Sequence, residues 1–172
     1  MKKKLLILFI MFFSLITLVG CGSNKDDEKE EEKLSDDEVL LENIKYKLDK
    51  DEEGYGIKYK IASNFRKTEL INAINYFSED INESPYFVIR LFHYQGKTIE
   101  YAINDSTESY DNRYETKIND LDYTVVHFIN YSGADVNIYY HLNGNDVYAF
   151  VFTSGIDLSR LVDIFLKSVD YN

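Results

Sequence analysis

The sequence predicts an α+β domain in which an antiparallel sheet of about six strands is packed by two or three helices. Several segments alternate apolar and polar residues with a period of two, which is typical of strands. The pair Asn143-Gly144 separates two such segments and is a strong hairpin signal. The last segment repeats apolar residues at helical spacing, so a C-terminal helix is expected to lie on the sheet.

The chain begins with the features of a cleaved export signal. A basic start at Lys2, Lys3 and Lys4 precedes an almost wholly apolar run from residue 5 to residue 19. This run is shorter than the roughly 20 residues of a membrane-spanning helix, and its flanks are typical of a secretory signal. We therefore divide the chain into a signal (1–20), an acidic tether (21–43) and one globular domain (44–172).

The end of the apolar run, Leu18-Val19-Gly20-Cys21, resembles a bacterial lipobox. The resemblance implies cleavage between Gly20 and Cys21 and attachment of diacylglycerol to the Cys21 thiol, since a thiolate is a strong nucleophile. A second acyl chain would make the anchor stable. We expect a lipoprotein at the extracytoplasmic face of a bacterial cell membrane. An uncleaved anchor with an incidental cysteine is the alternative.

The composition narrows the possible functions. The net charge is −11, and three of the 19 basic residues belong to the signal. Such an acidic chain argues against nucleic-acid binding, which needs a basic face. Cys21 is the only cysteine, so the exported domain has no disulfide. The sequence contains no HExxH, no glycine-rich phosphate loop and no nucleophile elbow, so we expect a non-enzymatic domain without a cofactor.

The tether is strongly acidic. Residues 25–38 contain nine acids and three lysines, and such a segment buries too little apolar surface to fold. A calcium site is a more specific alternative, because carboxylate oxygens are preferred ligands of hard cations such as Ca²⁺. Ser35 could begin a short helix that continues through Leu40 and Leu41.

Two alternating segments, 44–48 and 57–61, predict a hairpin joined by the polar turn at residues 49–56. One face of this hairpin carries lysines. They form a candidate contact patch for an anionic partner, or they protect the sheet edge from aggregation. The four residues are Lys45, Lys47, Lys58 and Lys60.

The middle of the chain is less clear. Residues 70–81 fit either a helix or a strand, and we favour a strand. Residues 86–94 are apolar on both faces, which indicates a central strand. Thr98 is positioned to cap a helix through Ile103, and residues 105–115 read as a polar loop.

The last third predicts a meander of three strands, at 121–131, 136–142 and 147–153, followed by a helix. Asp157 is the expected cap of this helix. A zinc site is also conceivable if the meander brings His127, His141 and Asp135 together, although a histidine on a strand surface is the simpler interpretation. The apolar stripe of the helix consists of Leu158, Leu161, Val162, Phe165, Leu166 and Val169.

The order of elements is similar to the PsbP-like fold, an antiparallel sheet between helices. The similarity would cover about residues 44–171, from the opening hairpin to Phe165-Leu166-Lys167-Ser168-Val169. It implies a binding or assembly-assisting module. We therefore expect a partner in the envelope, either a protein or a wall polymer. A small-ligand carrier with a pocket between sheet and helices is the alternative, followed by an unrecognised hydrolase.

Overall fold

The computed structural model describes residues 34–41, 43–78 and 87–171. These residues are mostly β, with 53% in strands and 13% in helices. Eleven strands form three antiparallel sheets, and the described residues contain two helices. The α+β class predicted from the sequence is therefore wrong, because several polar segments that read as turns or loops form strands. The similarity to the PsbP-like fold stays a prediction.

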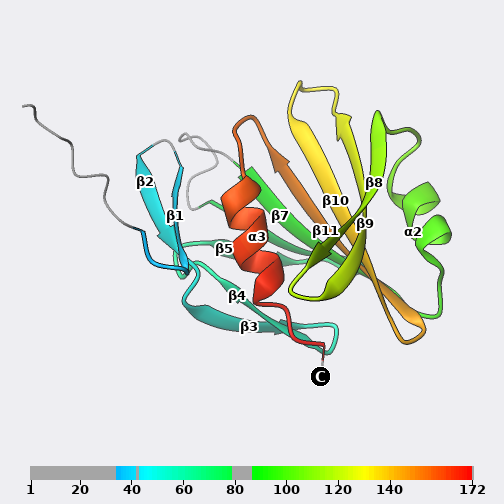
Figure 1. Cartoon of the computed structure of the whole chain (residues 1–172), viewed down its shortest axis with the longest axis horizontal. Helices are drawn as coiled ribbons and strands as arrows, with labels where there is room; N and C mark the ends of the chain where they lie inside the picture. The colour runs from blue at the N-terminus through cyan, green and yellow to red at the C-terminus, as the bar shows by residue number, and fades with distance from the viewer. Residues whose placement is uncertain (1–33, 42, 79–86, 172) are drawn as a thin grey trace, which may run out of the picture. The chain divides into compact units, whose positions relative to one another are not determined.

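The main sheet has seven strands in the order β5-β6-β7-β11-β10-β9-β8 (Figure 1). The central pair, β7 and β11, contains the predicted central strand, and apolar side chains fill both of its faces. The short β5 and the polar β8 form the edges. The strands are β5 (Arg66–Glu69), β6 (Ile74–Phe77), β7 (Phe87–Tyr94), β8 (Asn112–Ile118), β9 (Leu121–Ile129), β10 (Asp135–Asn143) and β11 (Asp146–Ser154).

Two separate hairpins precede the main sheet. They are β1 (Glu38–Leu41) with β2 (Ile44–Lys47), and β3 (Lys50–Gly54) with β4 (Ile57–Ile61). The predicted pairing of 44–48 with 57–61 is wrong. Tyr55 and Gly56 both have positive φ, 54° and 79°, which suits a two-residue turn that folds β3 back onto β4.

Charge pairing explains how the acidic β3 forms a strand at all. Asp and Glu are depleted in strands. The ladder, however, places Asp51 opposite Lys60 and Glu53 opposite Lys58, and opposite charges across a ladder contribute roughly 0.2–1 kcal/mol each. The acidic composition of residues 49–56 predicted a turn, because it does not reveal the lysines that lie opposite these acids in the ladder.

The helix α3 (Ser159–Lys167) covers one face of the main sheet, and the hairpins contribute to the same core. Phe165 is fully buried, and its ring centroid lies 5.6 Å from that of Tyr59, 5.7 Å from that of Phe150 and 5.6 Å from that of Phe152. Burying such a side chain contributes about 1.5–3 kcal/mol. The predicted C-terminal helix and its apolar stripe are confirmed.

The helix α2 (Ile99–Ser106) packs on the opposite face of the sheet. As predicted, Thr98 caps it, because its hydroxyl accepts a hydrogen bond from the Tyr101 amide at 3.2 Å. Ala102 and Ile103 are buried against β9, β10 and β11. Neither α2 nor α3 has the length and apolar character that crossing a membrane would require.

The meander is confirmed with small shifts. Asn143 pairs with Asp146 across the β10–β11 hairpin, so its two turn residues are Gly144 and Asn145 rather than the expected Asn143-Gly144. Gly144 has φ +61°, a conformation that favours glycine.

Two other predicted segments have different outcomes. The predicted polar loop at 105–115 is wrong from Asn112 onward, because β8 begins there. The ambiguous segment forms the strand β6, while residues 79–86 lie outside the described part.

The fold begins earlier than Ile44. The predicted short helix at 35–41 is wrong, since β1 starts at Glu38, and Val39 and Leu41 are buried in the core. Arg160 of α3 donates hydrogen bonds to the carbonyl oxygens of Glu38 at 2.8 Å and Ser35 at 3.0 Å. Residues 1–33, which include Cys21 and most of the predicted tether, lie outside the described residues, so the lipobox stays a prediction.

Candidate functional site

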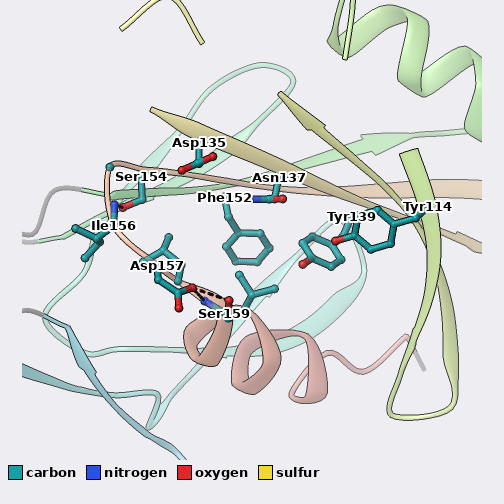
Figure 2. Close-up of a pocket in the computed structure, with 12 residues that line it drawn as sticks. Tyr114, Asp135, Asn137, Tyr139, Phe152, Ser154, Ile156, Asp157 and Ser159 are labelled. Atoms are coloured by element: carbon teal, nitrogen blue, oxygen red, sulfur yellow. Dashed lines mark hydrogen bonds between the residues drawn. The ribbon is translucent and has the colours of Figure 1, made fainter. Parts of the chain in front are cut away.

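A pocket of about 350 Å³ lies between the main sheet and the start of α3 (Figure 2). Its side chains come from three strands and from the loop that leads into the helix. The strands supply Tyr114 from β8, Asp135, Asn137 and Tyr139 from β10, and Phe152 and Ser154 from β11; the loop and helix supply Gly155, Ile156, Asp157, Leu158, Ser159 and Val162.

The register of β10 and β11 builds the floor of the pocket. Successive strand residues point to opposite faces, so Asp135, Asn137 and Tyr139 share the face that α3 covers. The ladder sets Asn137 opposite Phe152 and Asp135 opposite Ser154. The Ser154 hydroxyl accepts the Ile156 amide at 3.0 Å, which fixes the bend between β11 and the loop into α3.

One wall of the pocket is aromatic. The rings of Tyr139 and Phe152 meet edge to face, with centroids 5.8 Å apart. Burial raises the pKa of Tyr139, and the nearby Tyr114 hydroxyl raises it further. The Tyr139 hydroxyl therefore stays protonated at neutral pH and is able to donate a hydrogen bond.

The other wall is polar and acidic (Figure 2). The Asp157 carboxylate accepts hydrogen bonds from the amide of Ser159 at 2.9 Å and from its hydroxyl at 2.6 Å. These two bonds lower the pKa of Asp157, so it is charged at neutral pH. The predicted cap is off by one residue, because the N-cap of α3 is Leu158, whose side chain makes no capping hydrogen bond. Asp157 instead fixes the turn that leads into the helix.

Asp135 adds a second carboxylate, and its Oδ1 lies 2.9 Å from Nε2 of His127 on β9. The residues that line the pocket include no lysine and no arginine. Two carboxylates without a lining cation repel anions. The site thus favours neutral groups that form hydrogen bonds, or positively charged groups, which aromatic faces also attract.

The meander does not assemble the conceivable zinc site. His127 and Asp135 are close, but His127 pairs with Asn137 across the ladder, four residues before His141 on β10. Nδ1 of His141 lies 2.9 Å from the Asp122 carbonyl oxygen, and its ring packs against Tyr123 and Tyr171. The described residues contain no group of three or more candidate metal ligands among His, Cys, Asp and Glu.

The four predicted patch lysines lie on two hairpins and face acids. On the β1–β2 hairpin, Lys47 Nζ lies 3.7 Å from a carboxylate oxygen of Asp37. Hydrogen bonds with Ser35 are the main cause that lowers the pKa of Glu38, and the charge of Lys45 lowers it further. Lys58 and Lys60 line a hollow that also contains Asp51, Glu52, Glu53 and Asp170. Because acids surround them, these lysines do not form an isolated positive patch.

Sequence reasoning predicted none of these residues as a pocket. It expected Asp157 only as a cap, Asp135 only as a metal ligand, and Leu158 and Val162 only as part of the apolar stripe of the helix. One signal was present. Polar residues recur at every second position of β10, at Asp135, Asn137 and Tyr139, on a strand whose other face is apolar. The contribution of Tyr114 depends on β8, which the sequence did not predict.

Comparisons with known proteins give information on the fold alone. A solved structure from Bacteroides thetaiotaomicron VPI-5482 is similar, with a TM-score of 0.51 and 14% sequence identity. The alignment covers 68% of this chain and 45% of that one, so the chain spans less than half of its length. No known protein family matches the sequence, and no curated protein does either.

Proposed function

We propose that this protein is a lipid-anchored, non-enzymatic binding module of the bacterial cell envelope, and that the pocket between the main sheet and α3 receives a group of its partner. The observation that carries the proposal is that the aromatic rings of Tyr139 and Phe152 line one pocket together with polar groups. Asp135 and Asn137 lie beside the rings on the sheet, and Asp157 comes from the loop into α3. Apolar walls with a few placed polar groups are typical of ligand sites.

The charge of the pocket limits the partner. It suits a neutral or positively charged group on an envelope protein or a wall polymer. Sugar rings fit this description, because their flat C–H faces pack on aromatic rings and their hydroxyls bond to carboxylate and amide oxygens. A small-ligand carrier remains the second candidate, since about 350 Å³ lies within the range of small-molecule pockets.

The anchor is a separate part of the proposal and rests on the lipobox sequence Leu18-Val19-Gly20-Cys21. Replacing the cysteine, Cys21→Ser, removes the thiol that would be acylated. We expect it to abolish labelling by a radioactive fatty acid and to block normal processing. Unchanged labelling of the variant would show that the chain is not anchored in this way.

Chemical crosslinking in intact cells, followed by recovery of the full-length lipidated chain, tests the binding role. Asn137→Arg places a large cation inside the pocket, next to Asp135 on β10, and blocks the pocket. Asn145→Arg makes the same change in the exposed β10–β11 turn, at the other end of the sheet, and serves as the control. We expect the partner to be lost from Asn137→Arg alone. Equal recovery would refute the proposal, and recovery of only a small molecule would favour the carrier.

A further inference from the structure

A second groove, of about 340 Å³, lies on the opposite face of the main sheet beside α2. α2 spans eight residues and covers only part of this face (Figure 1). The groove has a floor of buried aliphatic side chains and walls of partly buried phenyl rings. The floor consists of Val136, Ile138 and Val151, and the walls include Phe92 and Phe128.

Arg90 is held rigidly over this apolar groove. Its Nε donates a hydrogen bond at 2.7 Å to the side-chain oxygen of Asn75, which is 3% exposed and lies directly opposite in the β6–β7 ladder. The guanidinium carbon is 5.9 Å from the centre of the Phe92 ring. Asn75 uses only one of the five N–H donors of Arg90. Among the residues that the structure describes, no hydrogen bond engages the two terminal nitrogens, which can therefore bind another acceptor.

The other three arginines of the chain are placed differently. Arg113 forms two hydrogen bonds with the Glu100 carboxylate, at 3.1 Å and 2.6 Å. Arg160 binds two backbone carbonyls, and Arg66 is exposed over the ring of Phe77. Within the described residues, Arg90 is thus the one arginine that is partly buried and contacts no carboxylate. A partly buried guanidinium of this kind is available to form charge-assisted hydrogen bonds with an anion.

We infer that the groove binds a fatty carboxylate, with the carboxylate on Arg90 and the acyl chain on the apolar floor. A guanidinium binds a carboxylate through two parallel hydrogen bonds, and one arginine matches a single negative charge. The only acidic lining residue, Asp105, interacts with the Tyr94 hydroxyl, four residues along β7 from Arg90. Repulsion from Asp105 therefore keeps the head of the ligand at the Arg90 end. This site is separate from the pocket at α3 and does not depend on its function.

A fatty carboxylate with a photoreactive group in its tail tests this inference on the full-length chain in its membrane. We expect adducts on peptides of β7, β9, β10 or β11. Unlabelled dodecanoate should compete at least about tenfold better than dodecyltrimethylammonium, because the latter has the same tail and a positive head. Equal competition by the two amphiphiles would show that the apolar floor alone binds and would overturn the inference.

Substitutions make the test specific for the arginine. Arg90→Gln should reduce labelling about tenfold, while Arg113→Gln, the matched control on the exposed edge strand, should leave it unchanged. Thr153→Trp fills the groove and leaves the Arg90–Asn75 bond in place, so it should also abolish labelling even if Arg90→Gln folds poorly. Full labelling of Thr153→Trp, or of folded Arg90→Gln, would contradict the assignment.

Discussion

The hydroxyl oxygens of Tyr59 and Tyr76 lie 2.7 Å apart in the core, where both side chains are at most 2% exposed. Tyr59 belongs to the β3–β4 hairpin and Tyr76 to the main sheet, so this hydrogen bond joins two sheets that share no ladder. Their rings also meet edge to face, with centroids 5.9 Å apart. The pair therefore fixes how the hairpin docks on the sheet.

Removing one hydroxyl of this pair should cost more than removing both. Tyr76→Phe leaves the buried Tyr59 hydroxyl without its partner, and we expect a loss of about 1–3 kcal/mol in the free energy of unfolding. The double variant Tyr59→Phe/Tyr76→Phe should recover most of that loss. Urea unfolding measures both. Strictly additive losses would mean that the two hydroxyls do not depend on each other.

Alkaline pH should unfold the protein. Burial is the main cause that raises the pKa of six tyrosines that lie in the core or pack against it, and it raises that of Tyr140 to about 12. Since an unfolded tyrosine has a pKa of about 10, the folded state keeps these protons longer. Stability is therefore complete below about pH 10 and falls as pH rises further. The other five are Tyr59, Tyr76, Tyr123, Tyr139 and Tyr171.

Thermal unfolding followed between pH 8 and pH 12, together with tyrosinate absorbance, checks this expectation. The core tyrosines should ionise only as the fold is lost, and the unfolding midpoint should fall over the same range. Complete ionisation near pH 10 in a chain that stays folded would contradict the burial of these hydroxyls.

Gly54 should not tolerate a side chain. A Cβ at this position would overlap Cδ1 of Ile74 on β6 and meet the Tyr59 hydroxyl at 3.0 Å. We expect Gly54→Ala to destabilise the protein by about 1–3 kcal/mol through overpacking. Gly155→Ala is the control, because nothing lies within 4 Å of its added Cβ. Differential scanning calorimetry of both variants gives the comparison, and equal melting temperatures would disprove the close approach.

The two hydrogen bonds from Arg160 to Ser35 and to Glu38, the first residue of β1, should control how tightly residues 35–41 are held. The Arg160 guanidinium reaches the carbonyls of both Ser35 and Glu38, and a lysine lacks this planar fork. We expect Arg160→Lys to speed hydrogen exchange at the amides of residues 35–41 while the amides of β11 stay protected. Unchanged exchange at residues 35–41 would show that these bonds do not hold the segment.

Local signals in the sequence predicted the second half of the fold well. Thr98 marks the start of α2, and the apolar stripe from Leu158 to Val169 marks α3, because capping and helical periodicity act within a few residues. Period-two alternation likewise revealed β9, β10 and β11. These elements depend on short-range patterns, so a single sequence contains enough information to find them.

Two of the missed strands have an unusual composition, although each pairs with the next strand in the sequence. β3 is acidic, and its pairing with Lys58 and Lys60 could not be read from either segment alone. β8 is polar because it is an edge strand with little burial. β1 was predicted as a short helix, and β5 was not predicted. Without these four strands the predicted strand content was too low, and the α+β class followed from that error.

The pocket was not predictable for a related reason. Its walls meet only after β8, β10, β11 and α3 have assembled, and no short motif contains Tyr114, Asn137 and Asp157 together. Arg90 and Asn75 form a pair only through the β6–β7 register. The lipobox, by contrast, lies in four consecutive residues ending at Cys21, and so the sequence alone suggested it.

The most direct test of the binding role is a photoreactive residue placed in the pocket of the full-length chain in intact cells. Benzoylphenylalanine at position 137 lies between the aromatic and acidic walls, and the same residue at position 145 lies in the exposed turn at the other end of the sheet. We predict an adduct with an envelope protein or wall polymer from position 137 and none from position 145. Equal adducts from both positions, or none from either, would contradict the assignment of this pocket as the binding site.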